Sequence, residues 1–432
     1  MKFKFIALVI VLSTLVMATT MYFFYPYDPY NPPVANDTGW TQDGLASVVD
    51  ANNQFAFTIY NEFAQQQSEN IFFSPYSIFS ALAMTYEGAK EQTASQMQQV
   101  FSFPESDVLQ PNFAALYNSI NKANAPYTLR VGNALWVEES FSLLDSYKDT
   151  VENYYGGKSV NLDLINQAQE SSQIINSFIA EQTNNRIQDI IPPGFIHRDT
   201  RLILSNAIYF LGDWKYEFNR RDTQSRDFYI TPDNVIQTDM MYLDPDERLY
   251  YGEFDTVEIL ELPYKGDEVV MKIILPKYGQ YLDMQTRSVR EYNYTLETIN
   301  MTYQMYRNYS NQMREVSMDA IYLPKFEFEA SYDLKQTLSD LGMPIAFSEQ
   351  ADFSGMTGRP NLFIDEVLHK AFIKVDEKGT EAAAATVVGM TITSAPMREL
   401  IFNANRPFLF VIEQKETDAI LFMGVVNDPR EE

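Results

Sequence analysis

The chain has 432 residues, with 58 acidic and 32 basic side chains, a net charge of −26 and no cysteine. The acidic balance argues against a nucleic-acid partner, and the lack of cysteine excludes disulfides, thiolate metal sites and thiol nucleophiles. With only two histidines, His197 and His369, neither a histidine-cluster metal site nor a cofactor is expected.

The N-terminus is typical of an export signal. Basic residues precede an uncharged run from Phe5 to Tyr27, and Val16-Met17-Ala18 is an acceptable cleavage site. Because the run is long enough to cross a bilayer uncut, residues 1–24 are interpreted either as a signal peptide or as a membrane anchor. Residues 25–43, rich in proline and tyrosine, are expected to form an extended linker. Residues 44–432 would then be extracellular, either secreted or tethered to the outer face of the membrane.

The body of the chain mixes helical and extended patterns. Helical spacing predicts helices over residues 44–67, 104–122, 143–155 and 166–185. Ser74-Pro75 is a further helix start, with serine as cap and proline in the first turn. Strand-like runs cover residues 128–137, 201–210, 257–263, 268–275 and 319–328. Because the two kinds of element do not alternate strictly, the expected class is α+β.

Residues 278–314 form a connection rich in tyrosine and asparagine. Its Asn-x-Ser/Thr triplets, together with one in the linker, could carry glycans in an exported protein. The alternative is a tyrosine-rich surface insertion without glycans, since such triplets are frequent by chance. The four candidate asparagines are Asn36, Asn293, Asn300 and Asn308.

The segment from Val375 to Met397 has an unusual composition for a loop. No charged residue occurs from Ala382 to Met397. In a strand, alternate residues face opposite sides, and the even-numbered row from Thr380 to Ile392 is small or apolar, while Glu381 lies on the other row. The pattern predicts a segment that is exposed in one state and buried as a strand in another. An alanine-rich helix or a plain loop are the alternatives.

EKGTEAAAAT, which begins at Glu377, resembles the reactive-loop hinge of the serpins. Four other segments resemble serpin segments in family order, and together they cover roughly residues 43–430. They are Asn70–Met97, Leu202–Phe218, Tyr322–Met343 and Phe402–Pro429. The resemblance implies a serpin fold of the α+β class, with three β-sheets, about nine helices and an exposed reactive-centre loop at residues 377–398. It also marks residues 278–314 as longer than the usual connection.

The resemblance implies an inhibitory serpin, which we expect to be a monomer and, from its N-terminal segment, to be exported. A serine endopeptidase, or a papain-like cysteine endopeptidase, would attack the loop and form an acyl-enzyme. The cleaved loop would then enter the central sheet as a new strand and distort the bound enzyme. The chain itself is not expected to be an enzyme, because no G-x-S-x-G pattern frames a nucleophilic serine.

Several loop residues would carry this mechanism. Gly379 would let the backbone swing, and Thr380 would be the first side chain to be buried. The expected hinge residues are Glu377, Gly379, Thr380, Glu381, Ala382, Ala383, Ala384 and Ala385. Counting seventeen residues from Glu377, as family loops are counted, places the reactive bond between Thr393 and Ser394. A small β-branched residue there suits an elastase-like or subtilisin-like protease and not trypsin, with Met390 and Met397 as alternative positions.

Two polar groups resemble the family's shutter and breach, which control opening of the central sheet. The shutter residues would be Ser74, Ser77, Asn206 and His369, although His369 alone could be an ordinary buried core histidine. The breach residues would be Trp214, Lys325 and Glu377, the last two forming an ion pair worth about 1 kcal/mol or less if it lies at the surface.

Two functions compete with inhibition. One is a non-inhibitory serpin that acts as a chaperone or carrier, and the other is a surface-anchored binding module. The intact hinge favours inhibition, because no bulky residue or proline interrupts it.

Overall fold

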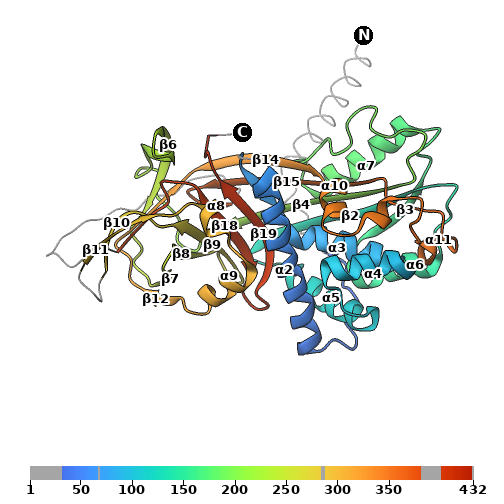
Figure 1. The fold of residues 1–432 in the computed structure, drawn as a ribbon, viewed down its shortest axis with the longest axis horizontal. Coiled ribbons are helices and arrows are strands. Elements are labelled where there is room, and N and C mark those ends of the chain that lie inside the picture. Colours follow the sequence, from blue (N-terminus) through green and yellow to red (C-terminus); the bar gives the residue numbers. More distant parts are fainter. Residues whose placement is uncertain (1–31, 67–68, 284–287, 381–399, 431–432) are drawn as a thin grey trace, which may run out of the picture.

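The computed structural model describes residues 32–66, 69–283, 288–380 and 400–430. Figure 1 shows most helices gathered at one end of the molecule, while strands extend toward the other end. Within these ranges no helix combines the length and the apolar character needed to cross a membrane. Residues 1–24, interpreted as signal or anchor, lie outside the described residues. The structure begins at Pro32, and Ala35 is already buried, with its backbone N–H donating to Asn118 at 2.9 Å.

The described residues contain ten α-helices, where about nine are expected from the resemblance. Helix α3 is fully buried; Ser74 caps it by accepting a hydrogen bond from the Ser77 N–H, and Pro75 occupies its first turn. The helices are α2 (Gln42–Gln66), α3 (Pro75–Tyr86), α4 (Glu91–Phe101), α5 (Ser106–Ile120), α6 (Asp145–Tyr155), α7 (Ala168–Gln182), α8 (Leu296–Ile299), α9 (Tyr303–Ser310), α10 (Lys335–Asp340) and α11 (Ser354–Thr357).

The central sheet has six strands in the order β14-β15-β16-β4-β2-β3. Its strand β4 is almost wholly buried along its length, as expected for a strand covered on both faces. Helix α3 packs against β2 and β4, and α7 packs against the same two strands. The strands are β2 (Tyr127–Glu138), β3 (Lys158–Leu162), β4 (Leu202–Asp213), β14 (Phe326–Asp333), β15 (Glu366–Asp376) and β16 (Gly379–Thr380).

Two other sheets complete the framework. A seven-stranded sheet has the order β1-β19-β18-β9-β8-β7-β12, and a four-stranded sheet has the order β17-β13-β6-β5. Their strands are β1 (Ile71–Phe73), β5 (Gln224–Thr231), β6 (Asn234–Leu243), β7 (Leu249–Glu253), β8 (Val257–Pro263), β9 (Val269–Pro276), β12 (Arg314–Val316), β13 (Ala320–Pro324), β17 (Ile401–Asn403), β18 (Phe408–Gln414) and β19 (Ala419–Val426). A large aromatic-rich core fills the space between the sheets and the helices, and a smaller core lies under α7.

One expectation for secondary structure needs correction. The predicted single strand over residues 319–328 is two strands, β13 and β14, which belong to different sheets. The chain changes sheet at Lys325, after Pro324, which has no N–H to continue the ladder. Residues 278–314 contain the ribbon β10–β11 (Tyr278–Asp283 and Ser288–Asn293) and two helices, α8 and α9, whose Ile299 and Tyr306 are buried.

Candidate functional site

The candidate site is the contact between β4 and β15, which is called the seam here. The two strands run parallel and pair from Ile203–Glu366 at the lower end to Ile208–Ala371. Their direct pairing ends there, and β16 lies between them at the upper end. Gly379 and Thr380 of β16 pair antiparallel with both neighbours: Val375 and Asp376 on one side, Gly212 and Asp213 on the other. The sheet is therefore forked, with the hinge residues Gly379 and Thr380 seated in the fork.

Thr380 is firmly placed in this fork. Its side chain is only 2% exposed, and its hydroxyl shares a 2.7 Å hydrogen bond with the hydroxyl of Tyr264. Tyr264 is itself fully buried and stacks on Trp214, with ring centroids 4.5 Å apart. Burial of a threonine at this position follows the even-numbered row of the sequence pattern, and its hydroxyl is satisfied by a partner.

Gly379 is required here by close backbone contact. A Cβ atom at this position would lie 2.0 Å from the carbonyl oxygen of Gly212 on β4. Real Cβ atoms do not approach backbone oxygens so closely, so any larger residue would push β16 away from β4. The sequence suggested freedom to swing as the reason for glycine, and the structure supplies this second, steric reason.

The turn before β16 is held by hydrogen bonds from the segment that follows β4. The indole Nε1 of Trp214 donates to the carbonyl of Asp376 at 3.1 Å, and the Trp214 backbone N–H donates to Lys378 at 2.6 Å. The backbone N–H of Phe218 donates to the carbonyl of Glu377 at 2.8 Å. Trp214 thus contacts the hinge directly at the upper end of the sheet.

The carboxylate of Glu377 is buried, which corrects the expectation of a surface ion pair. Its side chain is 3% exposed and lies 3.2 Å from the Lys325 ammonium and 3.7 Å from Arg220 Nε. Thr223 also donates to it, at 2.9 Å. Burial by itself would raise the pKa of Glu377, but hydrogen bonds from its own backbone, Thr223 and Lys325 lower the pKa on balance. The sequence analysis missed Arg220 and Thr223, since nothing in their local pattern sets them apart.

Midway along the seam, polar side chains form a buried row across three strands. Asn133 on β2 faces Asn206 on β4, and Asn206 faces His369 on β15. The Asn206 carboxamide oxygen is hydrogen-bonded to His369 Nδ1, and its nitrogen is hydrogen-bonded to the Asn133 carboxamide oxygen. Asn133 was missed in the sequence, although an asparagine beside the apolar run from Ala134 to Val137 was a usable signal.

Helix α3 connects to this row through its two serines. The backbone N–H of Ser74 donates to His369 Nε2 at 3.1 Å, and the Ser74 hydroxyl donates to the carbonyl of Leu421 at 2.6 Å. Asn206 Nδ2 donates to the Ser77 hydroxyl at 2.6 Å, and that hydroxyl donates to Asn133 at 3.0 Å. The structure therefore brings together the four residues expected to form the shutter and adds Asn133 to them.

These contacts define the state of the histidine. Because Nε2 accepts from the Ser74 N–H, Nδ1 carries the proton and donates to Asn206. His369 is fully buried, and this burial lowers its pKa to about 3, so that the neutral ring is the form present near pH 7. A neutral imidazole can exchange partners without placing a charge in the sheet.

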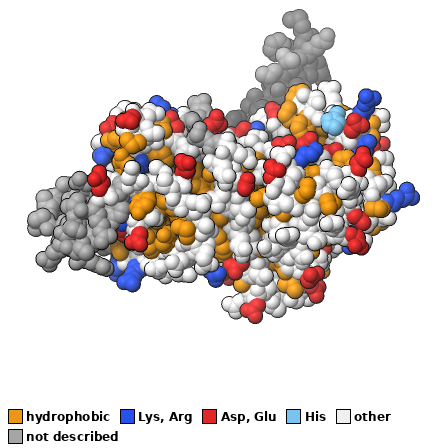
Figure 2. Space-filling view, viewed as in Figure 1, with side chains coloured by type: hydrophobic (Ala, Val, Ile, Leu, Met, Phe, Trp, Pro, Cys, Tyr) orange, Lys and Arg blue, Asp and Glu red, His pale blue; other side chains and the backbone are white. Residues whose placement is uncertain are grey.

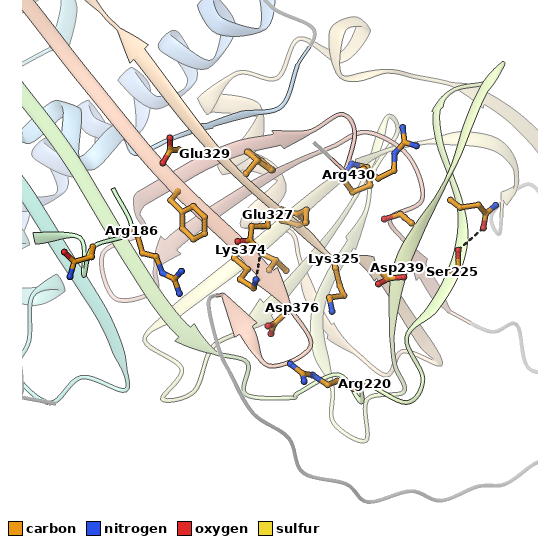
Figure 3. A pocket seen from close by; sticks show the side chains of 18 residues that line it. Arg186, Arg220, Ser225, Asp239, Lys325, Glu327, Glu329, Lys374, Asp376 and Arg430 are labelled. Atoms are coloured by element: carbon orange, nitrogen blue, oxygen red, sulfur yellow. Dashed lines mark hydrogen bonds and ion pairs between the residues drawn. The ribbon is translucent and has the colours of Figure 1, made fainter. Parts of the chain in front are cut away.

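A groove of about 920 Å³ lies over β14 and β15 beside the hinge. Figure 3 shows Lys325, Asp376 and Arg220 at one part of it and Arg186 with Glu329 at another. Lys374 and Glu327 form an ion pair within the groove. Its lining carries both signs of charge, and on the face shown in Figure 2 basic side chains do not gather into a continuous patch.

The remaining site expectations have different outcomes. Glu381, Ala382, Ala383, Ala384, Ala385, Thr393 and Ser394 lie outside the described residues. Asn36, Asn293, Asn300 and Asn308 are all exposed, as a glycan acceptor must be. Across the described ranges, no group of three or more His, Cys, Asp or Glu side chains is arranged to hold a metal ion.

Comparisons with known proteins agree on one family. The profile described as "Serpin (serine protease inhibitor)" matches residues 50–429. An uncharacterized serpin-like protein of Methanosarcina mazei is 39% identical over 389 residues, which cover 88% of this chain and 87% of that protein. The structure is similar to Serpin48 of the insect Tenebrio molitor, titled a highly specific serpin (TM-score 0.76, 29% identity, 90% of this chain and 100% of that one). It is also similar to human thyroxine-binding globulin in complex with thyroxine (TM-score 0.77, 28% identity, 89% and 99%).

Proposed function

The chain belongs to the serpin family, and we propose that it is a suicide-substrate inhibitor of serine or papain-like cysteine endopeptidases. The observation that carries the proposal is the position of Thr380, buried between β4 and β15 at the upper end of the seam. The hinge already occupies the first two positions of a new strand. A longer strand would continue in the same direction as β4 and β15 separate along the seam.

The register of β16 predicts the course of that strand. Because β16 is antiparallel to both neighbours, each later loop residue would pair one residue earlier on β4 and on β15. Continued six residues beyond Thr380, the strand would place Thr386 between Asn206 and His369. Thr386 belongs to the same small, even-numbered row as Thr380. Its hydroxyl could take over hydrogen bonds that the two shutter side chains now make to each other.

The chemical step is acyl transfer to the protease. Its serine or cysteine nucleophile would attack the carbonyl carbon of Thr393, an ester or thioester would form, and the Thr393–Ser394 amide bond would break. The leaving nitrogen would take a proton and become the α-amino group of Ser394. The residues up to Thr393 would then be free to enter the seam while still attached to the protease. About a dozen new ladder hydrogen bonds at ~1 kcal/mol each would supply on the order of 10 kcal/mol, comparable with the stability of a whole domain.

The target and location follow from the sequence and are part of the proposal. A threonine before the reactive bond suits the small specificity pocket of an elastase-like or subtilisin-like enzyme. The N-terminal signal or anchor would place the inhibitor outside the cell, secreted or membrane-tethered, where such enzymes act. The protein would work as a monomer.

A carrier function is the alternative, supported by two observations. A cavity of about 280 Å³ lies beside α2 and α9, and a solved neighbour is a thyroxine-binding globulin. The cavity is lined by charges that are paired with one another, among them Lys272 with Glu413, and Tyr303 donates to Asp50 at 2.8 Å. Its polar groups are therefore largely satisfied within the protein, and the seated hinge favours inhibition.

Denaturing gel electrophoresis tests the proposal. The purified protein is mixed with elastase-like, subtilisin-like, chymotrypsin-like, trypsin and papain-like enzymes. A band at the summed mass that survives boiling in detergent is expected with at least one enzyme. Mass spectrometry should show that the released peptide begins at Ser394. Cleavage of the loop by every enzyme, with each enzyme left fully active, would reject inhibition and favour the carrier.

A further inference from the structure

The lower end of the seam is closed by a buried carboxylate. Asp365, directly before β15, is 6% exposed, and its Oδ2 accepts hydrogen bonds from the backbone N–H of Arg201 at 2.5 Å and of Leu202 at 2.9 Å. The backbone N–H of Asp365 donates in turn to the carbonyl of Leu202 at 2.9 Å. Three hydrogen bonds therefore join Asp365 to Leu202, the first residue of β4, and to Arg201 directly before it.

These bonds involve a charged acceptor in a largely buried position, where they are stronger than bonds between neutral groups. Burial nevertheless raises the pKa of Asp365, against the opposing effect of the two backbone N–H groups. Burying a carboxylate costs free energy, and β15 is already paired to β4 by the backbone ladder from Glu366 onward. The side chain is thus an addition to the ladder, placed at one end of the seam.

The strand register shows when the inserting loop would meet this carboxylate. Ten residues beyond Gly379, Gly389 would lie between Ile203 and Glu366, the last pair of the seam. The next residue, Met390, would lie between Leu202 and Asp365. Insertion as far as Val388 leaves the Asp365 bonds intact, and insertion past Gly389 requires them to break.

We propose that Asp365 is a positioning residue that latches the lower end of the seam and controls the last step of loop insertion. This inference rests on the proposed function, in which the loop enters the seam. A slow last step would leave the acyl-enzyme more time to be hydrolysed. Asp365 would thereby set the fraction of encounters that end in a trapped protease and not in a cleaved inhibitor.

Two synthetic peptides test the latch without any protease. One has the sequence of residues 381–388, which stops above the latch, and the other has the sequence of residues 381–392, which passes it. Annealing of fluorescein-labelled peptide to the intact protein is followed on native gels. Asp365→Ala should anneal the longer peptide roughly tenfold faster than the unchanged protein, and the shorter peptide at the unchanged rate.

Glu138→Ala is the matched control. Glu138 is a buried carboxylate at the same end of the sheet and also accepts from two successive backbone N–H groups, Leu164 at 2.8 Å and Ile165 at 3.2 Å. Its bonds lie on the other side of β4, away from the seam. Glu138→Ala should destabilise the protein about as much as Asp365→Ala does and should leave the annealing rate of the longer peptide unchanged. Asp365→Asn keeps one acceptor oxygen, so its annealing rate with the longer peptide should lie between those of Asp365→Ala and the unchanged protein. This variant replaces Asp365→Ala in the test if Asp365→Ala does not fold.

The outcomes are distinct. Equal acceleration of both peptides, an equal effect of Glu138→Ala, or no acceleration by either Asp365 variant would overturn the latch. If the short peptide does not anneal to any of the proteins, the annealing rate of the long peptide still tests the latch, because it should rise in the Asp365 variants and not in Glu138→Ala. Absence of covalent complexes with every protease would reject inhibition, while a length-dependent peptide effect would still establish the latch.

Discussion

His369 on β15 and Asn206 on β4 lie directly opposite each other in register and are hydrogen-bonded across the seam. This bond stands where the register of β16 would place Thr386. Opening the seam therefore means breaking a specific side-chain pair as well as backbone bonds.

Replacing Thr380 tests whether the seated hinge matters. In Thr380→Arg, a guanidinium would have to enter the buried site beside Tyr264, at a cost of several kcal/mol. We expect the protease to cleave the loop at its usual rate but to be released, so that covalent complexes fall at least tenfold on denaturing gels. Thr58→Arg, on the exposed face of α2, is the control and should inhibit normally. Undiminished complex formation by Thr380→Arg would show that this residue need not be buried.

The Glu377–Lys325 contact should stabilise the seated hinge. Because Glu377 is buried and also faces Arg220, the pair should be worth more than a surface ion pair, about 1–3 kcal/mol in a double-mutant cycle. We expect Glu377→Gln to raise hydrogen exchange at Gly379 and Thr380, with the N–H groups of β2 unaffected. A coupling energy near zero between Glu377→Gln and Lys325→Met would contradict this prediction.

Acid should weaken the seam through His369. The pKa of His369 is lowered to about 3 from an ordinary 6.5. The unfolded chain therefore binds this proton more readily than the folded chain, and the contribution to stability, on the order of 5 kcal/mol, is complete above pH 6.5 and is lost as the pH falls toward 3. Urea unfolding at a series of pH values should show this loss in the unchanged protein and a smaller one in His369→Gln.

Glu366 should act in the opposite direction at the lower end of the seam. Burial, followed by the nearby Asp333, raises its pKa to about 7. Asp365 acts in the same sense, and Lys335 opposes it. Since the folded chain holds this proton more tightly than the unfolded chain, stability should decline as the pH rises from about 4.5 to 7. Glu366→Gln should flatten that part of the urea profile, and an unchanged slope would contradict the assignment.

Much of the architecture could be predicted from the sequence. The α+β class and three-sheet serpin fold are confirmed by the family match and the solved neighbours, and α2, α5, α6 and α7 lie close to their predicted ranges. These elements carry strong local signals in their apolar spacing. The break between β13 and β14 was missed because apolar residues continue on both sides of Pro324 and Lys325, and only long-range pairing assigns the two strands to different sheets.

Site residues could be predicted where they matched a position of the family, but not where their role depends on a contact with a residue far away in the sequence. His369, Asn206, Ser74 and Ser77 were expected and do meet. Tyr264 was not expected, since its hydroxyl reaches Thr380 from 116 positions earlier in the chain. The burial of Glu377 could not be predicted either, because it depends on long-range hydrogen bonds from Trp214 and Phe218 to this turn.

The forked sheet has a consequence for how the protein ages. If the loop completes the sheet, the fold with the fork is not the most stable arrangement of this chain and persists only because conversion is slow. The inhibitory fold is then characterised by how long it lasts before conversion. Inhibitory activity would decay during storage as a first-order process, with no chemical damage and no change in mass, and heating would shorten that lifetime steeply.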